Sequence, residues 1–244
     1  MGGRIGAKVV VGALAVASAA CGQGDGAPAP ATGPAAYEPS IDPTEFTSVI
    51  DNPYLPLLPG SRWVYEGESE GEQERIVVTV TDRTREVMGV TCVVVRDAVT
   101  IGGELAELTF DWYAQDAEGS VWYFGEETAE YENGKVKTTE GSWEAGVDGA
   151  QPGILMFGTP EIGVPYRQEY YAGHAEDMGQ VTQLGAAVTV PYGAFEEVLV
   201  TEDWTPLDTK FLEHKYYAPG VGVVLERSLK GPKELVQLVE FLAP

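Results

Sequence analysis

A short polar segment carries side chains of the kind that bind divalent cations. His174, Glu176 and Asp177 fall within four consecutive positions. One imidazole nitrogen and two carboxylates are suitable ligands for a divalent metal ion. The chain has 38 Asp and Glu residues, however, so carboxylates are expected near any histidine. A solvated turn containing Gly173 explains the same residues, and both the metal-site hypothesis and this alternative remain open.

A second set of residues surrounds a scarce cation and suggests an amphipathic binding site. An arginine inside an aromatic pocket can bind a carboxylate or phosphate group with two parallel hydrogen bonds. Pairing of Arg167 with one of the many carboxylates is the simpler alternative. The candidate ligand-binding residues are Trp143, Met156, Phe157, Tyr166, Arg167 and Tyr170.

Motifs of the common enzyme classes are missing from the sequence. It contains no Gly-x-Ser-x-Gly segment, no His-Glu-x-x-His segment, no calcium-binding EF-hand loop and no phosphate-binding glycine loop. We therefore name no catalytic residue and expect no cofactor. Enzymatic activity stays open, but the sequence favours a protein that is not an enzyme.

Charge and composition exclude some partners. The 244 residues include 15 Lys and Arg against 38 Asp and Glu, a net charge of −23, and 44% are hydrophobic. Such an acidic chain is a poor partner for nucleic acid. Its composition is that of an ordinary folded domain. The oligomeric state cannot be predicted from these values.

The N-terminus has the three zones of a secretory signal peptide. Arg4 and Lys8 precede an apolar stretch from Val9 to Ala20, and small residues lead to Cys21. The run Ala17-Ser18-Ala19-Ala20-Cys21 resembles the lipobox of bacterial lipoproteins, although Ser18 departs from the usual Leu or Val. This resemblance implies that Cys21 becomes the acylated first residue, so the lipid would hold the protein extracytoplasmically on the bacterial cell membrane. The alternative is ordinary secretory cleavage.

We expect three regions along the chain. Residues 1–20 form the signal peptide, and residues 21–40 form the lipidated N-terminus and a flexible linker rich in Ala, Pro and Gly. Residues 41–244 form the folded domain. Acylation of Cys21 would leave Cys92 without a disulfide partner, and we expect Cys92 to be a buried, unreactive thiol in a β-branched run.

The folded domain is predicted to be all-β. Apolar residues alternate with polar ones, as in Ile76, Val78 and Val80, which places them on one face of a strand. Turn signals such as Asn133-Gly134 favour antiparallel hairpins. We predict a single strongly curved antiparallel sheet or open β-barrel of about ten strands. The predicted strands are 62–67, 75–81, 86–100, 106–112, 120–124, 166–171, 178–190, 197–204, 210–217, 221–229 and 234–242.

One long segment interrupts the strand pattern. Residues 141–165 are rich in Gly and Pro but also contain Trp143, Met156 and Phe157. A long loop with apolar residues is usually functional rather than disordered. We therefore expect a folded flap over one face of the sheet.

Two motifs in the domain resemble segments of uncharacterised bacterial envelope proteins. Asn52-Pro53-Tyr54-Leu55-Pro56-Leu57 leads through Pro59-Gly60 to Trp63-Val64-Tyr65, and Tyr216-Tyr217-Ala218-Pro219-Gly220-Val221-Gly222 forms a later turn. Such proteins are expected to have curved antiparallel sheets, loosely similar to periplasmic carriers of lipoproteins and lipids. The resemblance implies a fold rather than a function.

Three hypotheses about function follow from the sequence. The leading one is a membrane-anchored lipoprotein that binds a lipid-like or other amphipathic ligand between its sheet and flap, because aromatic residues lie on both faces of strands such as Trp122-Tyr123-Phe124. The second is a cation-binding or hydrolytic site at His174, Glu176 and Asp177. The third is an interaction module of an envelope assembly.

Overall fold

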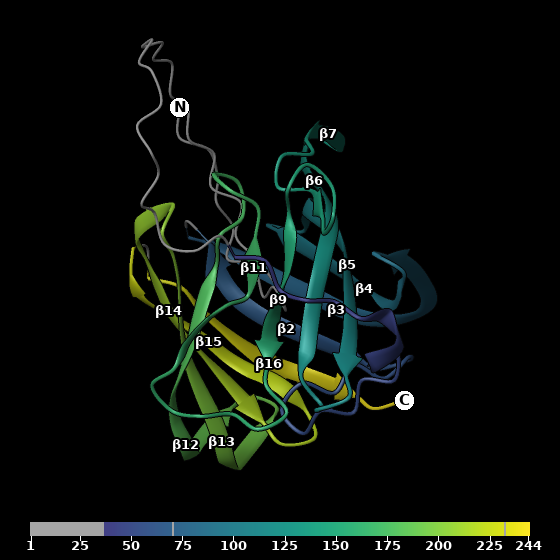
Figure 1. The fold of residues 1–244 in the computed structure, drawn as a ribbon. Coiled ribbons are helices and arrows are strands. Elements are labelled where there is room, and N and C mark those ends of the chain that lie inside the picture. The colour runs from purple at the N-terminus through teal and green to yellow at the C-terminus, as the bar shows by residue number, and fades with distance from the viewer. Residues whose placement is uncertain (1–36, 70, 232) are drawn as a thin grey trace.

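The computed structural model describes residues 37–69, 71–231 and 233–244. This part of the chain is all-β, as predicted: sixteen strands join in one sheet, and the helical element in it is the short 3-10 helix η1 (Pro43–Glu45) (Figure 1). The strands are β1 (Phe46–Thr47), β2 (Arg62–Ser69), β3 (Glu72–Val87), β4 (Val90–Ile101), β5 (Glu104–Asp116), β6 (Val121–Glu132), β7 (Lys135–Thr138), β8 (Trp143–Glu144), β9 (Gln151–Met156), β10 (Pro165–Arg167), β11 (Glu169–Tyr170), β12 (Met178–Val190), β13 (Gly193–Thr205), β14 (Asp208–Ala218), β15 (Gly222–Lys230) and β16 (Leu235–Leu242).

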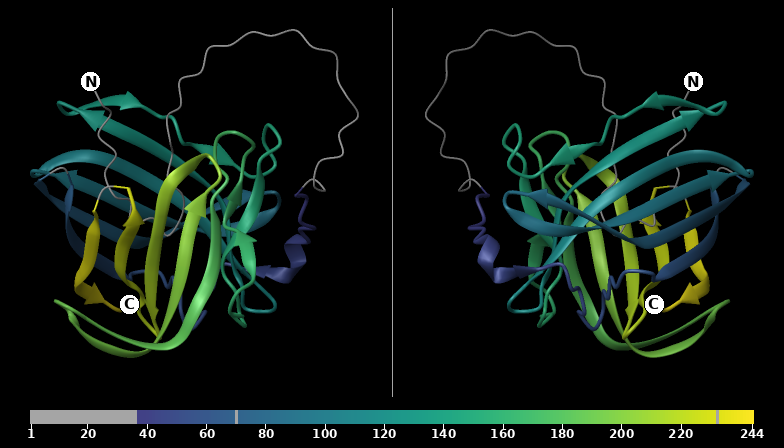
Figure 2. Two further views of the ribbon diagram at one scale, coloured as in Figure 1. Left: turned by 90° about the vertical axis from the view of Figure 1, so that its left-hand side faces the viewer. Right: turned by 90° about the vertical axis from the view of Figure 1, so that its right-hand side faces the viewer.

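The sheet curves until its two edges meet. Its main path has the order β10-β12-β13-β14-β15-β16-β2-β3-β4-β5-β6-β9-β11, and every pair of neighbouring strands is antiparallel. Figures 1 and 2 show the sheet wrapped around a common interior, with the green and yellow strands β12 to β16 facing the blue and teal strands β3 to β6. This arrangement agrees with the predicted curved sheet or barrel.

One continuous segment joins the two edges. Residues 165–167 pair with β12 as β10, and residues 169–170 pair with β9 as β11. Two glycines permit this close approach: a Cβ atom on Gly153 would lie 2.3 Å from the backbone carbon of Gln168, and one on Gly179 would lie 2.7 Å from the side-chain nitrogen Nε2 of Gln168. The barrel-like shape therefore depends on small residues on both neighbouring strands.

The two motifs that resemble envelope proteins pack against each other. The Gly220 amide donates to the Pro53 carbonyl at 2.8 Å, and the Trp63 indole N–H donates to the Val221 carbonyl at 2.8 Å. The buried Asn52 side chain donates to the carbonyls of Gly119 and Phe157 and accepts from two amides of its own turn. These contacts give both motifs a structural role at the start of β2 and β15.

Hairpin turns explain one success and one error of the sequence interpretation. Asn133 and Gly134 have φ angles of 53° and 71°, which confirms the predicted turn between β6 and β7. The prediction of one strand over 86–100 is wrong, because β3 ends at Val87, Met88 and Gly89 turn with φ angles of 52° and 80°, and β4 starts at Val90. A Met-Gly pair is not a typical signal for two successive positive φ angles, so the turn was missed.

The segment 141–165 is partly incorporated into the sheet. It contains β8 and β9, and both pair with β6. Together with the short strands β1, β7, β10 and β11, they raise the strand count above the predicted ten. The remaining loop, 157–164, returns to β12, where the Gly163 amide donates to the Val181 carbonyl.

The chain already packs on the domain before the expected boundary at residue 41. The Tyr37 hydroxyl donates to the Pro152 carbonyl at 3.0 Å, and its ring lies 5.7 Å from that of Tyr170. The expected signal peptide, the lipidated Cys21 and most of the linker lie outside the described residues. Within the described part, no helix has the length and apolar character that crossing a membrane requires.

Both faces of the sheet bury apolar side chains. Tyr65, Tyr113 and Tyr123 are fully buried on the concave face, whereas Phe46 covers Trp122 and Phe124 on the convex face. Cys92 is free, fully buried and 3.7 Å from the Val90 carbonyl, and burial raises the pKa of its thiol to about 12. A thiol with this pKa is almost entirely protonated at neutral pH, as expected for an unreactive cysteine.

Candidate functional site on the concave face

A row of polar side chains crosses the strands β13, β14 and β15. Thr201 lies directly opposite Lys215, and Lys215 lies directly opposite Glu226. Residues that are directly paired in an antiparallel sheet share a face, so the three side chains stand side by side. Asp203 and Glu213 form the next pair on the same face. All five side chains are buried.

A second polar group lies across the interior, on β4, β5 and β6. Asp111 is paired with Glu126, and the Tyr123 hydroxyl donates to Asp111 Oδ1 at 2.9 Å. The rings of Tyr113 and Tyr123 stack with centroids 5.0 Å apart. Asp97, on β4, belongs to the same group. Burial first, and then Asp111 and Glu126, raises the pKa of Tyr113 and of Tyr123 well above the ordinary value.

The two polar groups share one electrostatic environment. Burial is the largest effect that raises the pKa of Tyr65, and Glu226 and Asp97 raise it further from opposite sides of the interior. Glu226 on β15 also interacts with Asp97 on β4. The two polar groups therefore influence each other electrostatically across the interior.

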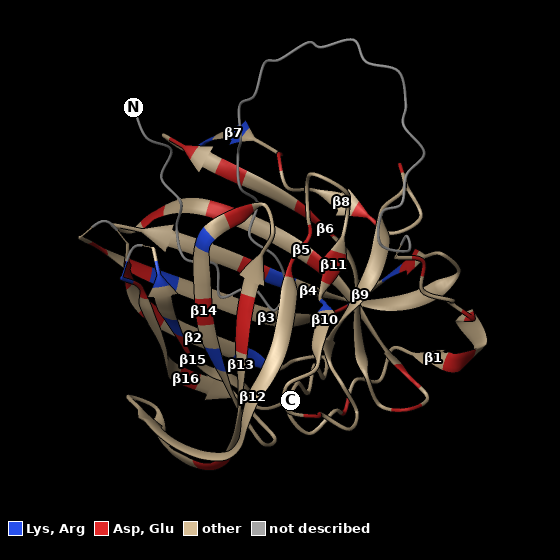
Figure 3. Ribbon diagram, turned by 60° about the vertical axis from the view of Figure 1, so that its left-hand side comes forward, with Lys and Arg blue, Asp and Glu red and all other residues tan. Residues whose placement is uncertain are grey.

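Acidic side chains outnumber basic ones in this buried region. Among the described residues, nine acidic side chains and one lysine are buried: Glu74, Asp97, Asp111, Glu126, Glu169, Asp177, Asp203, Glu213 and Glu226 with Lys215. In Figure 3 acidic positions follow the strands of the sheet and are not confined to the turns. Buried carboxylates need protons, hydrogen bonds or cations to offset the loss of hydration.

Lys215 partly balances this charge. Its Nζ atom lies 3.2 Å from Glu213 Oε1 and 3.5 Å from Asp203 Oδ2. Burial alone would lower the pKa of Lys215, but Glu213, Glu226 and Asp203 outweigh burial and raise the pKa well above its ordinary value. Lys215 therefore stays protonated and acts as a fixed positive charge, not as a nucleophile.

Several buried polar atoms on the concave face lack a hydrogen-bond partner among the described residues. They are Thr201 Oγ1, Asp203 Oδ1, Glu226 Oε1, both carboxyl oxygens of Glu74 and the indole nitrogen of Trp143. Burial raises the pKa of Glu226 well above its ordinary value, against the opposing effect of Lys215. Buried polar groups in folded proteins are nearly always hydrogen-bonded, so this concentration requires an explanation.

Part of the sequence-predicted ligand set lies at this face. Trp143 is paired with Glu126, and its ring lies 5.3 Å from that of Tyr123 in an edge-to-face contact. Tyr166 is buried, with Asp203 and Lys215 in its electrostatic environment. Phe157 packs edge-to-face on Tyr166, and Met156 is fully buried.

The other two predicted ligand residues belong to a separate cluster. The Arg167 guanidinium lies 4.5 Å from the Tyr170 ring centroid and 5.6 Å from the Tyr37 ring centroid. Arg167 Nη1 also lies 3.9 Å from Glu176 Oε2. Burial raises the pKa of Tyr37 to about 12, while Arg167 opposes this shift. The expected pairing of Arg167 with a carboxylate is thus observed, together with two cation–π contacts.

The three candidate metal ligands point to different surroundings. The His174 ring stacks on Tyr171 with centroids 4.4 Å apart, Glu176 accepts from the Gly173 amide, and Asp177 is buried near Glu213. In the described part of the chain, no group of three or more His, Cys, Asp or Glu side chains is arranged to hold a metal ion. The structure therefore gives no support to a metal centre at these residues.

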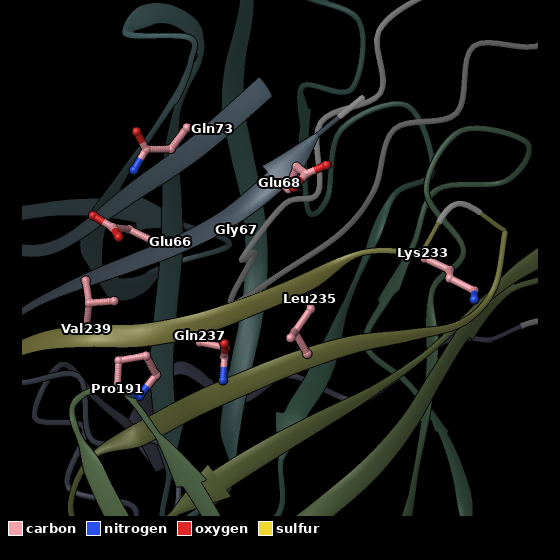
Figure 4. Close-up of a pocket in the computed structure, with 9 residues that line it drawn as sticks. All are labelled: Glu66, Gly67, Glu68, Gln73, Pro191, Lys233, Leu235, Gln237 and Val239. Carbon is pink, nitrogen blue, oxygen red and sulfur yellow. The ribbon is translucent and has the colours of Figure 1, made fainter. Parts of the chain in front are cut away.

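A surface pocket lies on the convex side of β2 and β16. Figure 4 shows side chains of β2, β3 and β16 around it, with Pro191 and Lys233 contributed by adjoining loops. Glu66, one of its acidic residues, is held by Arg75 at 2.9 Å. The pocket contains none of the sequence-predicted site residues and none of the buried atoms without a partner.

The sequence interpretation did not identify Thr201, Asp203, Lys215 or Glu226. A signal was present, because Thr201 and Asp203 alternate in one strand and Glu213 and Lys215 alternate in the next. Alternation alone does not identify a site. Only the register between β13 and β14 shows that Thr201 and Asp203 lie beside Lys215 and Glu213.

Comparisons with known proteins leave the family of this chain unassigned. No known protein-family profile matches the sequence, and no curated protein matches it. Among solved structures, the crystal structure of a candidate lipoprotein from Parabacteroides distasonis is similar, with a TM-score of 0.42 and 11% sequence identity. The similarity covers 78% of this chain and 99% of that one, a level that assigns no function.

Proposed function

We propose that this chain is a membrane-anchored extracytoplasmic protein that binds an amphipathic ligand against its concave face. One observation carries the ligand-binding part: buried hydrogen-bonding atoms without a described partner lie among fully buried tyrosine rings on that face. Leaving a buried donor or acceptor unsatisfied costs about 1–3 kcal/mol. Aromatic walls with a few polar groups are typical of small-molecule sites.

The ligand proposal can be tested by native mass spectrometry of the full chain, released from cell membranes in one detergent step. We expect a bound species of defined mass that is not the detergent. Thr201→Phe, which fills the concave face with a ring, should abolish this species. Thr79→Phe should retain it, because Thr79 alternates with the concave residue Val78 and lies on the convex face.

Two outcomes of this experiment would contradict ligand binding. One is a wild-type spectrum that contains only protein and detergent. The other is a bound species that Thr201→Phe retains at the level of Thr79→Phe, since the ligand would then lie elsewhere.

The anchoring part rests on the lipobox-like sequence before Cys21. In cells fed labelled palmitate, we expect the label to follow the full chain and to disappear in Cys21→Ala. Cys92→Ala should keep the label, because Cys92 is fully buried. A wild-type chain without label would show that lipid does not anchor the protein.

A further inference from the structure

We infer that the ligand of the concave face carries a cationic amine, which Glu226, Asp203 and Thr201 bind beside Lys215. This inference rests on the proposed function and names the chemical class of its ligand. It concerns the row that crosses β13, β14 and β15.

The number and type of buried oxygen atoms in this row suit an ammonium group. Lys215 contacts Glu213 Oε1 and Asp203 Oδ2. Asp203 Oδ1 and Glu226 Oε1 have no hydrogen-bond donor among the described residues. Thr201 Oγ1 also has no described partner. An ammonium group has three N–H donors and no acceptor, so it matches three oxygen acceptors. Hydrogen bonds from an ammonium group to a carboxylate are stronger than hydrogen bonds between neutral groups.

The charge of the surrounding face favours a cation over an anion. Glu213, Glu226 and Asp203 surround Lys215 electrostatically, so a carboxylate, sulfate or phosphate headgroup would add a further acidic group to a buried site with one lysine and would lose its hydration. A bare metal ion is also a poor match, because the described residues offer no group of three suitable ligands. The rings of Tyr65, Tyr166 and Tyr217 are buried at the same face and provide apolar area for the stem of the ligand.

Proton binding gives a second, independent expectation for the same site. Burial raises the pKa of Glu226 well above its ordinary value; Lys215 opposes this effect, whereas Glu213, Asp203 and Asp97 reinforce it. A proton therefore competes with an ammonium group for the Glu226 carboxyl group. Affinity for an amine should then rise with pH, because Glu226 loses its proton, until the amine itself loses its own proton.

The test compares three probes of equal chain length, octylamine, octanol and octanoate, by titration calorimetry on the purified full chain. We expect octylamine to bind more tightly than octanol and octanoate to bind least. Glu226→Gln should weaken octylamine binding by about tenfold or more, the usual loss for a hydrogen bond to a charged group. The same change should leave octanol binding unaltered.

A matched control separates the site from a general loss of charge. Glu202→Gln removes one carboxylate from the same strand as Thr201 and Asp203, but Glu202 lies on the opposite face beside His214. It should leave all three affinities unchanged. Thr201→Val provides a second, conservative variant if circular dichroism shows that Glu226→Gln does not fold, and it should weaken octylamine selectively.

Two failures can be told apart. If octanol or octanoate binds as tightly as octylamine, and Glu226→Gln and Thr201→Val change nothing, the amine inference is wrong while amphiphile binding stands. If none of the three probes binds to the folded chain, the proposed function itself is wrong.

Discussion

Replacement of Lys215 by methionine is expected to destabilise the folded chain by about 3–5 kcal/mol at pH 7.5, the usual loss when one partner of a buried ion pair is removed. Lys215 is the one buried lysine among the described residues, and it contacts Glu213 and Asp203. Methionine fills a similar volume but provides no charge. The free energy of unfolding, measured with urea, checks this expectation.

A control substitution and the pH dependence test whether the loss of the Lys215 charge causes the destabilisation. Lys210→Met, at an exposed position of the same strand, should change the free energy of unfolding by less than about 0.5 kcal/mol. Burial raises the pKa of Glu213 and of Glu226, and Lys215 opposes both shifts. Without Lys215 these carboxyl groups remain protonated to higher pH, so the destabilisation should shrink between pH 7.5 and pH 5. Equal effects of the two lysine substitutions would show that Lys215 does not balance buried charge.

Replacement of Glu74 by glutamine is expected to stabilise the chain at pH 8 by about 2–4 kcal/mol. Glu74 is fully buried beside Gly67 and Val236, and neither carboxyl oxygen has a described hydrogen-bond partner. Burial first, and then Glu234 and Glu107, raises the pKa of Glu74 to about 8. Glutamine has nearly the same shape but cannot ionise.

The direction of the Glu74 effect follows from proton linkage. A carboxyl group with a raised pKa keeps its full stability below its unfolded pKa of about 4.5 and loses it as the pH rises through its folded pKa of about 8. Glu74→Gln should therefore have almost no effect at pH 4 and its largest effect at pH 8. Glu86→Gln, at an exposed position on the same strand, should have little effect at either pH. A Glu74→Gln effect of equal size at both pH values would mean that ionisation is not its cause.

The sequence predicted the structure best where the signal depends only on residues that are adjacent in the chain. Alternation of apolar residues identified the sheet, and Asn133-Gly134 identified a hairpin, because both signals are local. The turn at Met88-Gly89 was missed because its backbone is imposed by the pairing of β3 with β4. The closure of the sheet through 165–170 depends on contacts with Gly153 and Gly179, which are not visible in the sequence alone.

The candidate site shows why adjacent residues are a weak guide to a shared site. Tyr166 and Arg167 are neighbours in an extended strand, so their side chains leave it in opposite directions, and one joins the concave face while the other stacks on Tyr37 and Tyr170. Glu176 and Asp177 also have different surroundings, because Glu176 accepts from the Gly173 amide whereas Asp177 is buried. Lys215 was overlooked because lysine is rarely buried without a charged partner, and its partners come from pairing that only the structure reveals.

The most direct measurement of the central claim is a crystal structure of the full chain with 8-bromooctylamine, in which anomalous scattering locates the bromine. We expect the amine nitrogen within hydrogen-bond distance of Glu226 and the bromine among the tyrosine rings of the concave face. A bromine peak on the convex side, or none at a concentration that saturates binding in solution, would contradict ligand binding at the concave face.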